Sequence, residues 1–190
     1  ILRALKPTSR GGVTGFLDQI TAYNTLPAGL KERIEGKSVV YRMGRWNEFK
    51  YGQPNPLRLI KNSPAIEGAY GRLDKDFLPV AHPMVFVQEE TGRKALNVSP
   101  FFAYYVYGMA NAEGDALLKE VCDHIHKRPS YHHKWSTTEL VLWDNGRMLH
   151  KVTPVPLDEF RLLQRTTIKG DYGVGKQLGL EAVQPRGAAA

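Results

Sequence analysis

The sequence has one cysteine, Cys122, and no long run of apolar residues. A single thiol cannot form a disulfide bond within the chain, as is typical of proteins in a reducing compartment. No stretch approaches the roughly 20 apolar residues that a membrane-spanning helix needs, and the first residues lack the charged-then-apolar pattern of a signal peptide. We therefore expect a cytoplasmic protein with no membrane partner.

Clusters of basic residues are also absent, although the chain has 26 Lys and Arg against 19 Asp and Glu, a formal charge of +7. Proteins that bind nucleic acids gather lysine and arginine on one surface, where they neutralise phosphates and release counterions. Here the basic residues are scattered along the sequence. This pattern argues against a nucleic-acid partner and fits better with the attraction of small anions into a cleft.

The 190 residues, 42% of them hydrophobic, are enough for one domain with a sizeable core, residues 1–190. Residues 43–79 differ from the rest, because Gly, Pro, Asn and charged residues dominate and periodicity is weak. A long segment of this kind is more often functional than decorative, so we expect a lid over a binding site. Its aromatic residues either touch a substrate or anchor the lid to the domain: Trp46, Phe49, Tyr51 and Tyr70.

Elsewhere the sequence predicts short strands and a few helices. Apolar residues recur on one helical face over residues 112–126, and Pro27 and Gly36 delimit a helix over residues 28–34. A further helix is expected over residues 17–23. Strands are predicted at residues 1–5, 38–42, 83–87, 94–98, 131–135, 139–143 and 160–168. The predicted fold class is α+β with a mainly β core.

The most informative segment begins with an apolar strand end at residues 140–145, continues through His150, and reaches Arg161 and Arg165. A non-heme Fe(II) oxygenase binds its metal with two histidines and one carboxylate, and His150 suits one of these places. Arginine pairs a carboxylate in bidentate fashion and keeps its charge when partly buried. Because residues four apart on a strand point to the same face, both guanidinium groups can enter one cavity.

Several motifs resemble the taurine dioxygenase and chlorophenoxyacetate dioxygenase (TauD/TfdA) family. The C-terminal signature is similar in the run WDNGRMLH, in the spacing from His150 to both arginines, and in the ending RTTIKGD. Upstream, the segment GGVT at residues 11–14 resembles the family's GGDT, and residues 82–83 and 91–93 resemble its HP and TGR stretches. The resemblance runs from about residue 2 to residue 171, with five motifs in the family's order.

The resemblance implies Fe(II)- and alpha-ketoglutarate-dependent hydroxylation of a small organic substrate, with release of succinate and CO2. The implied fold is a double-stranded β-helix, or jelly roll, with flanking helices. His150 resembles the distal iron ligand, and Arg161 resembles the salt-bridge partner of the remote carboxylate of the cosubstrate. Thr14 resembles a hydroxyl partner of the same carboxylate.

The resemblance also implies a substrate pocket. Arg165 resembles a second pocket arginine, which faces either the cosubstrate or an acidic group of the substrate. Trp135 and Trp143 match tryptophans that flank the site and are expected to contact the substrate. The implied partners are the small-molecule substrate, molecular oxygen and further copies of the chain in a dimer or tetramer.

One departure from the family concerns the metal. The family's first two iron ligands form a His-x-Asp pair about two dozen residues before the position of Thr14, and this chain contains no His-x-Asp or His-x-Glu. Three explanations are open: a missing first part, a shortened and inactive relative, or ligands from another chain. The alternative function is thus an inactive or truncated jelly-roll protein that binds a small carboxylate or a partner. A second departure is Val13, where the family usually has an acid.

Structural roles compete with the functional ones. Either arginine can form an ion pair with Asp158, Glu159 or Asp171 instead of binding an anion. Thr14 can be a helix N-cap. The remaining histidines have weaker claims as metal ligands: His124 and His126 lie two apart on a helix, His132 and His133 point to opposite sides of a strand, and His82 is expected to be structural.

Overall fold

The computed structural model describes residues 1–43, 76–168 and 175–182, together with residues 51, 64, 67, 68, 72 and 170. The expected lid at residues 43–79 therefore lies mostly outside the described residues, as do Trp46, Phe49 and Tyr70. Tyr51 is described, and it is buried in the core with its hydroxyl donating to Asp115. For this aromatic residue, the role of anchor fits better than that of substrate contact.

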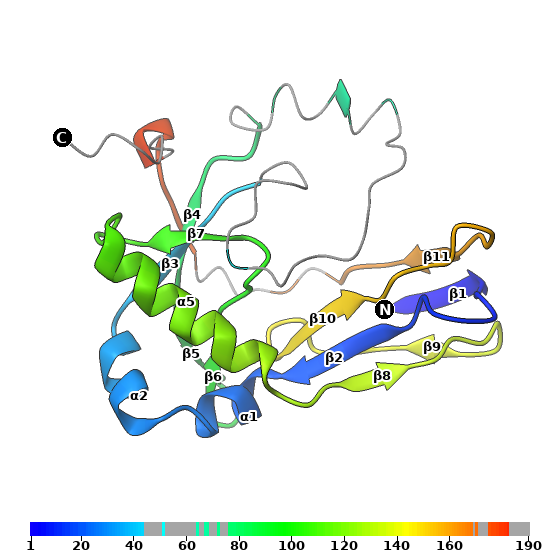
Figure 1. Cartoon of the computed structure of the whole chain (residues 1–190), viewed down its shortest axis with the longest axis horizontal. Coiled ribbons are helices and arrows are strands. Elements are labelled where there is room, and N and C mark those ends of the chain that lie inside the picture. The colour runs from blue at the N-terminus through cyan, green and yellow to red at the C-terminus, as the bar shows by residue number, and fades with distance from the viewer. Residues whose placement is uncertain are drawn as a thin grey trace.

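Two antiparallel three-stranded sheets lie in one half of the molecule (Figure 1). The first has the order β11-β1-β9, and the second has the order β10-β2-β8. Along the sequence the chain moves repeatedly between them, so that neighbours within a sheet come from distant segments. The six strands are β1 (Leu2–Lys6), β2 (Thr14–Asp18), β8 (Tyr131–His133), β9 (Leu140–Val141), β10 (Met148–Val152) and β11 (Leu162–Arg165).

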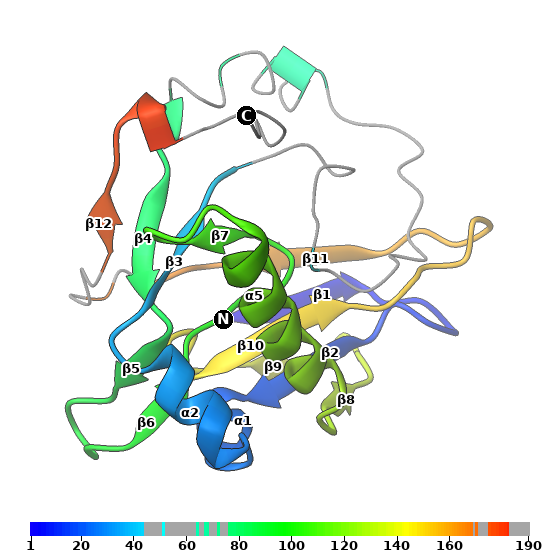
Figure 2. The ribbon, with the colours of Figure 1, turned by 60° about the vertical axis from the view of Figure 1, so that its left-hand side comes forward.

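The other half contains a four-stranded sheet in the order β12-β4-β3-β7, a β5-β6 hairpin and the helices (Figure 2). Its strands are β3 (Ser38–Tyr41), β4 (Val80–Pro83), β5 (Val85–Val87), β6 (Lys94–Leu96), β7 (Ala103–Val106) and β12 (Lys176–Gln177). The helices are α1 (Gln19–Asn24), α2 (Ala28–Ile34), α5 (Ala112–His126) and the short 3-10 helix η1 (Leu180–Ala182).

Helix α5 has the bounds that its apolar periodicity predicts. The side chain of Asn111 caps it by accepting a hydrogen bond from the Gly114 backbone N–H at 3.0 Å. Acidic residues occupy its first turn and histidines its last, as the helix dipole favours. Its apolar face packs in the main core against α1, α2 and the strands beside them, and the buried residues of this face are Leu117, Leu118, Val121, Cys122 and Ile125.

The elements differ from the predicted ones in some details. The helix expected from residue 17 begins only at Gln19, because Leu17 and Asp18 complete β2 and the Asp18 side chain caps α1 through the Ile20 N–H. His150 falls outside the strands predicted from the sequence, but it lies in β10, paired with Phe16. Strands β7 and β12 were not predicted either. The α+β class with a mainly β core is confirmed by the described elements.

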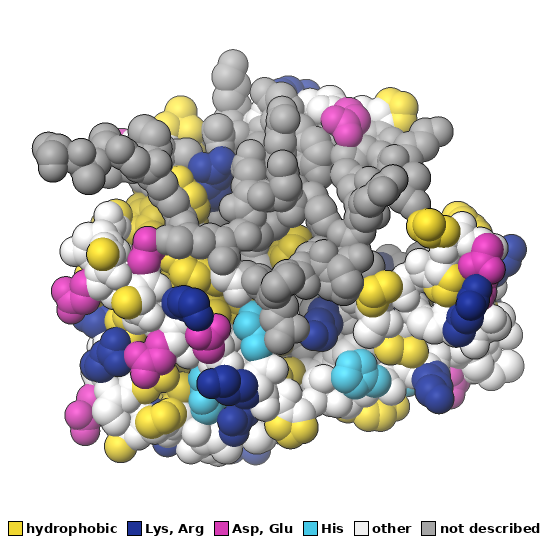
Figure 3. All heavy atoms as spheres, in the orientation of Figure 1, with side chains coloured by type: hydrophobic (Ala, Val, Ile, Leu, Met, Phe, Trp, Pro, Cys, Tyr) yellow, Lys and Arg dark blue, Asp and Glu magenta, His cyan; other side chains and the backbone are white. Residues whose placement is uncertain are grey.

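Charged side chains of both signs are mixed on the surface, as their scatter along the sequence predicts. On the face shown in Figure 3, basic side chains lie among acidic ones and form no single patch. No helix in the described part of the chain is long and apolar enough to cross a membrane.

Candidate active site

Strand β2 is the centre of the site. Its residues Thr14, Phe16 and Asp18 share one face, because successive side chains of a strand point to opposite sides. The flanking strands β8 and β10 both pair with β2 in regular register, so they bring their own side chains onto the same face. The residues so gathered are Tyr131 and His133 from β8, and Met148, His150 and Val152 from β10.

His150 lies in an aromatic setting. Its ring packs edge-on against Trp143, with centroids 5.1 Å apart, and lies 6.3 Å from the ring of Phe16. Desolvation and the positive charge of Arg165 lower the pKa of His150, so the neutral imidazole dominates at neutral pH. Among the described residues none hydrogen-bonds the ring nitrogens. A neutral imidazole with a free lone pair is the form that binds a metal ion.

Arg161 is held just before β11 by two neutral oxygen atoms. Its Nε donates to the backbone oxygen of Gly12 at 2.7 Å, and its Nη2 donates to the Thr14 hydroxyl oxygen at 3.2 Å. The side chain is partly buried, and this desolvation lowers the pKa of the guanidinium. No carboxylate in the described part of the chain pairs with it. A cation in this position is set up to receive an anion.

The alternative role of Arg161, an ion pair with a nearby acidic residue, is wrong for two of the three candidate partners. Asp158 pairs with Arg10 at 2.8 Å, and Glu159 accepts from Arg10 and from the backbone and side chain of Ser9. Asp171 lies outside the described residues. The acidic side chains beside Arg161 in sequence thus hold the Arg10 loop in place and leave the guanidinium for another partner.

Gly12 explains why the GGVT segment begins with glycines. Its φ of +59° is left-handed, and a Cβ placed there would lie 2.6 Å from Thr8 Oγ1 and 3.0 Å from Arg161 Cδ. The first contact is a clash and the second would displace the arginine. Only glycine allows the backbone oxygen and the guanidinium to approach in this way.

Thr14 is a buried strand residue, 3% exposed, and not the helix N-cap of the alternative reading. Its hydroxyl oxygen accepts two hydrogen bonds, from Arg161 Nη2 and from Trp135 Nε1 at 3.0 Å. The predicted pair of Thr14 and Arg161 is therefore brought together directly. Trp135 belongs to the same hydrogen-bonded group, a connection that the sequence did not indicate.

The two arginines serve different parts of the site. Arg165 is exposed on β11, opposite Leu2. Its positive charge lowers the pKa of His150. Arg161 precedes the first residue of β11, so the strand predicted over residues 160–168 is shorter than expected. Trp143 contributes a ring that packs on His150 and Phe16, while its indole N–H donates to Asn145 at 3.3 Å.

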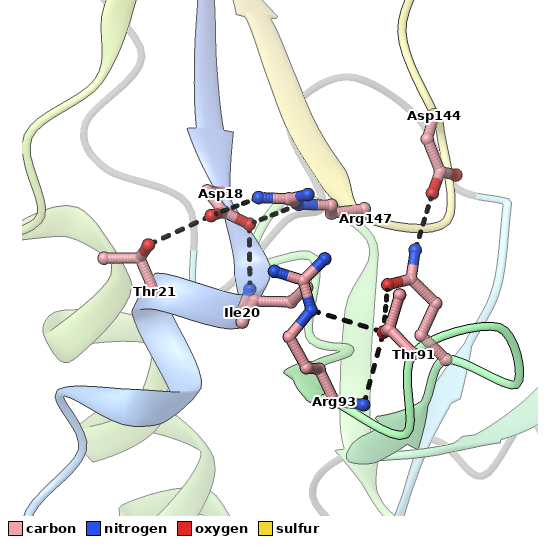
Figure 4. Close-up of polar contacts among 8 residues, drawn as sticks. Asp18, Ile20, Thr21, Thr91, Arg93, Asp144 and Arg147 are labelled. Carbon is pink, nitrogen blue, oxygen red and sulfur yellow. Dashed lines mark hydrogen bonds and ion pairs between the residues drawn. The ribbon is translucent and has the colours of Figure 1, made fainter.

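An ion pair that the sequence analysis missed fixes the position of β10 (Figure 4). Arg147 donates to both carboxylate oxygens of Asp18, from Nε at 3.0 Å and from Nη2 at 2.9 Å. Asp18 also accepts from Ile20 and Thr21 at the start of α1. The hydrogen bond to Arg147 is the largest cause that lowers the pKa of Asp18. No local sequence signal joins two residues so far apart.

A second contact reaches the same turn from the β5-β6 hairpin, also drawn in Figure 4. Gln88 Nε2 donates to Asp144 Oδ2 at 3.2 Å, and the Gln88 side-chain oxygen accepts from Thr91 at 2.8 Å. Thr91 also accepts from Arg93 at 3.2 Å. The TGR stretch therefore supports the turn that precedes β10.

The remaining histidines make structural contacts. His124 Nε2 lies 3.0 Å from the Ala22 backbone oxygen, and His126 Nε2 lies 3.1 Å from that of Tyr51. Both rings therefore have backbone partners, which agrees with their weak claims as metal ligands. His82 packs edge-on against Tyr41, in line with its expected structural role. The described residues contain no group of three side chains able to hold a metal ion.

Comparison of the sequence with protein families shows where the chain belongs. Residues 1–167 match the family described as "Taurine catabolism dioxygenase TauD, TfdA family". The chain belongs to the TauD/TfdA family, as its motifs predict.

Over the aligned residues, the chain is 30–33% identical to two curated relatives. It is 33% identical over 165 residues to the (S)-phenoxypropionate/alpha-ketoglutarate-dioxygenase of Sphingobium herbicidovorans, covering 86% of this chain and 54% of that protein. It is 30% identical over 171 residues to a putative alpha-ketoglutarate-dependent sulfonate dioxygenase of Schizosaccharomyces pombe. That alignment covers 89% of this chain and 40% of the yeast protein. The chain thus spans about half the length of these relatives.

Solved structures show the same likeness. The crystal structure of AAD-2 in complex with Mn(II) and N-oxalylglycine superposes with a TM-score of 0.65 and 26% identity, covering 86% of this chain and 59% of that one. A putative alpha-ketoglutarate-dependent taurine dioxygenase from Burkholderia xenovorans gives a TM-score of 0.64 and 26% identity, covering 85% and 50%.

Proposed function

We propose that the chain is part of an Fe(II)- and alpha-ketoglutarate-dependent dioxygenase that hydroxylates a small organic substrate and releases succinate and CO2. In this proposal residues 1–190 form one jelly-roll domain, and residues 43–79 form its lid. The enzyme acts in the cytoplasm as a dimer or tetramer. The names of the relatives support the reaction class, because they include dioxygenases of a phenoxypropionate and of sulfonates.

The observation that carries this proposal is the state of Arg161. Its guanidinium is partly buried, bonded to two neutral oxygens, and without a carboxylate partner among the described residues. A buried charge left unpaired is costly, so the site favours an anionic ligand. The remote carboxylate of alpha-ketoglutarate fits this place, with Thr14 beside it as a second hydrogen-bonding group.

The residues present fit the metal in part. His150 supplies one neutral nitrogen of the kind that an iron site uses, and the other two ligands would come from polypeptide outside this sequence, which contains no His-x-Asp. When bound, the iron and the keto acid supply the oxidising chemistry. The chain's own residues bind and orient: Arg161 and Thr14 fix the far end of the cosubstrate, and Trp143 fixes the plane of the His150 ring. Arg165, Trp135 and Trp143 would border the substrate, which suits an anionic group beside Arg165.

Two substitutions distinguish the residue proposed to bind the metal from the residue proposed to bind the anion. Arg161→Ala should abolish measurable binding of alpha-ketoglutarate and of glutarate, its analogue without the keto group, whereas His150→Ala should leave glutarate affinity unchanged. In the longer protein that supplies the two further iron ligands, His150→Ala should weaken Mn(II) binding and Arg161→Ala should leave it intact. Arg33→Ala is the matched arginine control, because Arg33 on α2 forms an exposed ion pair with Glu120 on α5. Glutarate binding that survives Arg161→Ala would refute the assignment, and in active enzyme the same substitution should raise the cosubstrate KM sharply.

The alternative is a protein that binds a small carboxylate without oxidising anything. It is favoured by one observation, the absence of His-x-Asp and His-x-Glu from the sequence. Fe(II)-dependent formation of succinate from alpha-ketoglutarate distinguishes the two functions. It should be measured on protein purified from its natural source, and the N-terminal sequence of the same sample should be determined. Turnover supports the dioxygenase, and glutarate binding without turnover supports the carboxylate-binding protein.

A further inference from the structure

We propose that Trp135 is a positioning residue, which fixes the Thr14 hydroxyl as a hydrogen-bond donor toward the bound carboxylate. This inference rests on the proposed function and deepens it, because it assigns Trp135 to the cosubstrate end of the pocket. In this inference the indole N–H of Trp135 acts through Thr14, while its ring remains beside the substrate as proposed above.

The argument begins with the hydrogen-bonding capacity of the Thr14 hydroxyl. A hydroxyl has two acceptor lone pairs and one proton to donate. Trp135 Nε1 and Arg161 Nη2 both point their hydrogens at Thr14 Oγ1, at 3.0 and 3.2 Å. An indole N–H and a guanidinium N–H are donors only. They fill both lone pairs, so the hydroxyl proton is directed to a third partner.

No residue in the described part of the chain accepts that proton. Thr14 is 3% exposed, so bulk water does not readily satisfy it. A buried donor without an acceptor costs free energy, and a ligand oxygen placed beside Arg161 would remove this cost. The site therefore presents two donors side by side, the Arg161 guanidinium and the Thr14 hydroxyl. Such a pair selects a carboxylate and rejects an ammonium or amide N–H at the same place.

Trp135 is itself held firmly. It follows β8 by two residues, and β8 pairs with β2 so that His133 lies opposite Thr14. The rings of His133 and Trp135 pack edge-on, with centroids 4.5 Å apart and planes at 80°. This contact sets the direction of the indole N–H. Because the indole N–H already donates to Thr14, it is not available to hydrogen-bond a substrate.

The test is an NMR titration of the intact chain with glutarate, in which the dissociation constant is read from ¹H–¹⁵N shifts. Trp135→Phe removes the N–H and keeps an aromatic ring. We expect it to weaken glutarate binding roughly three- to tenfold, as the loss of one orienting hydrogen bond predicts. Tyr105→Phe is the control, since it removes a side-chain donor to Ala182 in the other half of the molecule and should leave the affinity unchanged.

A double-mutant cycle distinguishes positioning from general packing. Thr14→Val should weaken binding about tenfold, and Trp135→Phe added to it should change the affinity less than about twofold. Thr14→Ser keeps the hydroxyl and should keep the full sensitivity to Trp135→Phe. The indole N–H resonance of Trp135 should also move upfield in Thr14→Val, because it loses its acceptor. Independent, additive effects would overturn the inference, as would unchanged affinity in Trp135→Phe.

The outcomes also separate this inference from the proposed function. If the unmodified chain does not bind glutarate, the proposed function fails and the inference fails with it. If glutarate binds, is lost in Arg161→Ala, and is unaffected by Trp135→Phe, only the inference fails. If Trp135→Phe does not fold, the comparison of Thr14→Ser with Thr14→Val and the indole resonance decide the question.

Discussion

Asp18 and Arg147 share two parallel hydrogen bonds, of 3.0 and 2.9 Å, that join the end of β2 to the turn before β10. Bidentate pairs of this kind fix both distance and orientation. Met148, the next residue, begins β10 directly opposite Asp18. The pair therefore sets the register that places His150 against Phe16, although it touches neither.

Breaking this pair should destabilise the protein. We expect Asp18→Asn to lower the free energy of unfolding by about 1–3 kcal/mol, because it weakens a partly buried charged hydrogen bond and the cap of α1. The measurement is urea unfolding followed by circular dichroism. The control is Asp123→Asn, which breaks the exposed Lys119–Asp123 pair on α5 and should cost no more than about 0.5 kcal/mol. Equal effects of the two substitutions would contradict the structural role.

The same pair should make stability depend on acid. The pKa of Asp18 is lowered from its ordinary value of 3.8, mainly by the hydrogen bond from Arg147. Its contribution is therefore fully present above the ordinary pKa and is lost as the pH falls through the lowered one. Between about pH 5 and about pH 3 the unfolding free energy should fall less in Asp18→Asn than in the unmodified chain. Parallel pH profiles would show that Asp18 contributes nothing.

Gly12 and Gly36 offer a matched comparison. Both have left-handed backbones, φ +59° and +70°, so alanine at either position should cost about 1 kcal/mol in strain. A Cβ at Gly36 meets nothing within 4 Å, whereas one at Gly12 reaches Arg161 Cδ at 3.0 Å. Gly12→Ala should thus also weaken glutarate binding, by roughly tenfold, through a displaced guanidinium. Similar glutarate affinities in the two variants would show that the close approach does not matter.

Cys122 should be inert in the folded protein. The side chain is 1% exposed, and desolvation raises the pKa of the thiol to about 12. Because the thiolate is the reactive form, a thiol-specific disulfide reagent near pH 8 should label Cys122 only after denaturant is added. Rapid labelling of the native protein would mean that α5 opens easily from the core.

Local patterns predicted the parts of this structure that depend on neighbours in sequence. The apolar stripe of α5 and the Pro and Gly signals around α2 act within a few residues, and both helices have the predicted bounds. The grouping of Arg161 with Thr14 was also predicted, but through the resemblance to a family. Single-residue arguments would have made Thr14 a helix cap, since nothing local shows that β2 continues to Asp18.

The remaining features depend on pairing between distant segments. His150 belongs to a strand because β2 offers it an edge, and no residue near His150 indicates this. The Trp135 hydrogen bond to Thr14 joins residues 121 positions apart, and the Arg147–Asp18 pair joins residues 129 apart. Tertiary pairing of this kind overrides the local preferences on which sequence patterns rest.

Strand β2 has five residues, and three on one face have three different duties. Thr14 accepts a hydrogen bond from Arg161, Phe16 packs near the His150 ring, and Asp18 pairs with Arg147. A slip of one residue in this strand would turn all three side chains to the opposite face at once. Variation within β2 should therefore be limited to exchanges of side chains, and an insertion or deletion there should never yield a partly working protein.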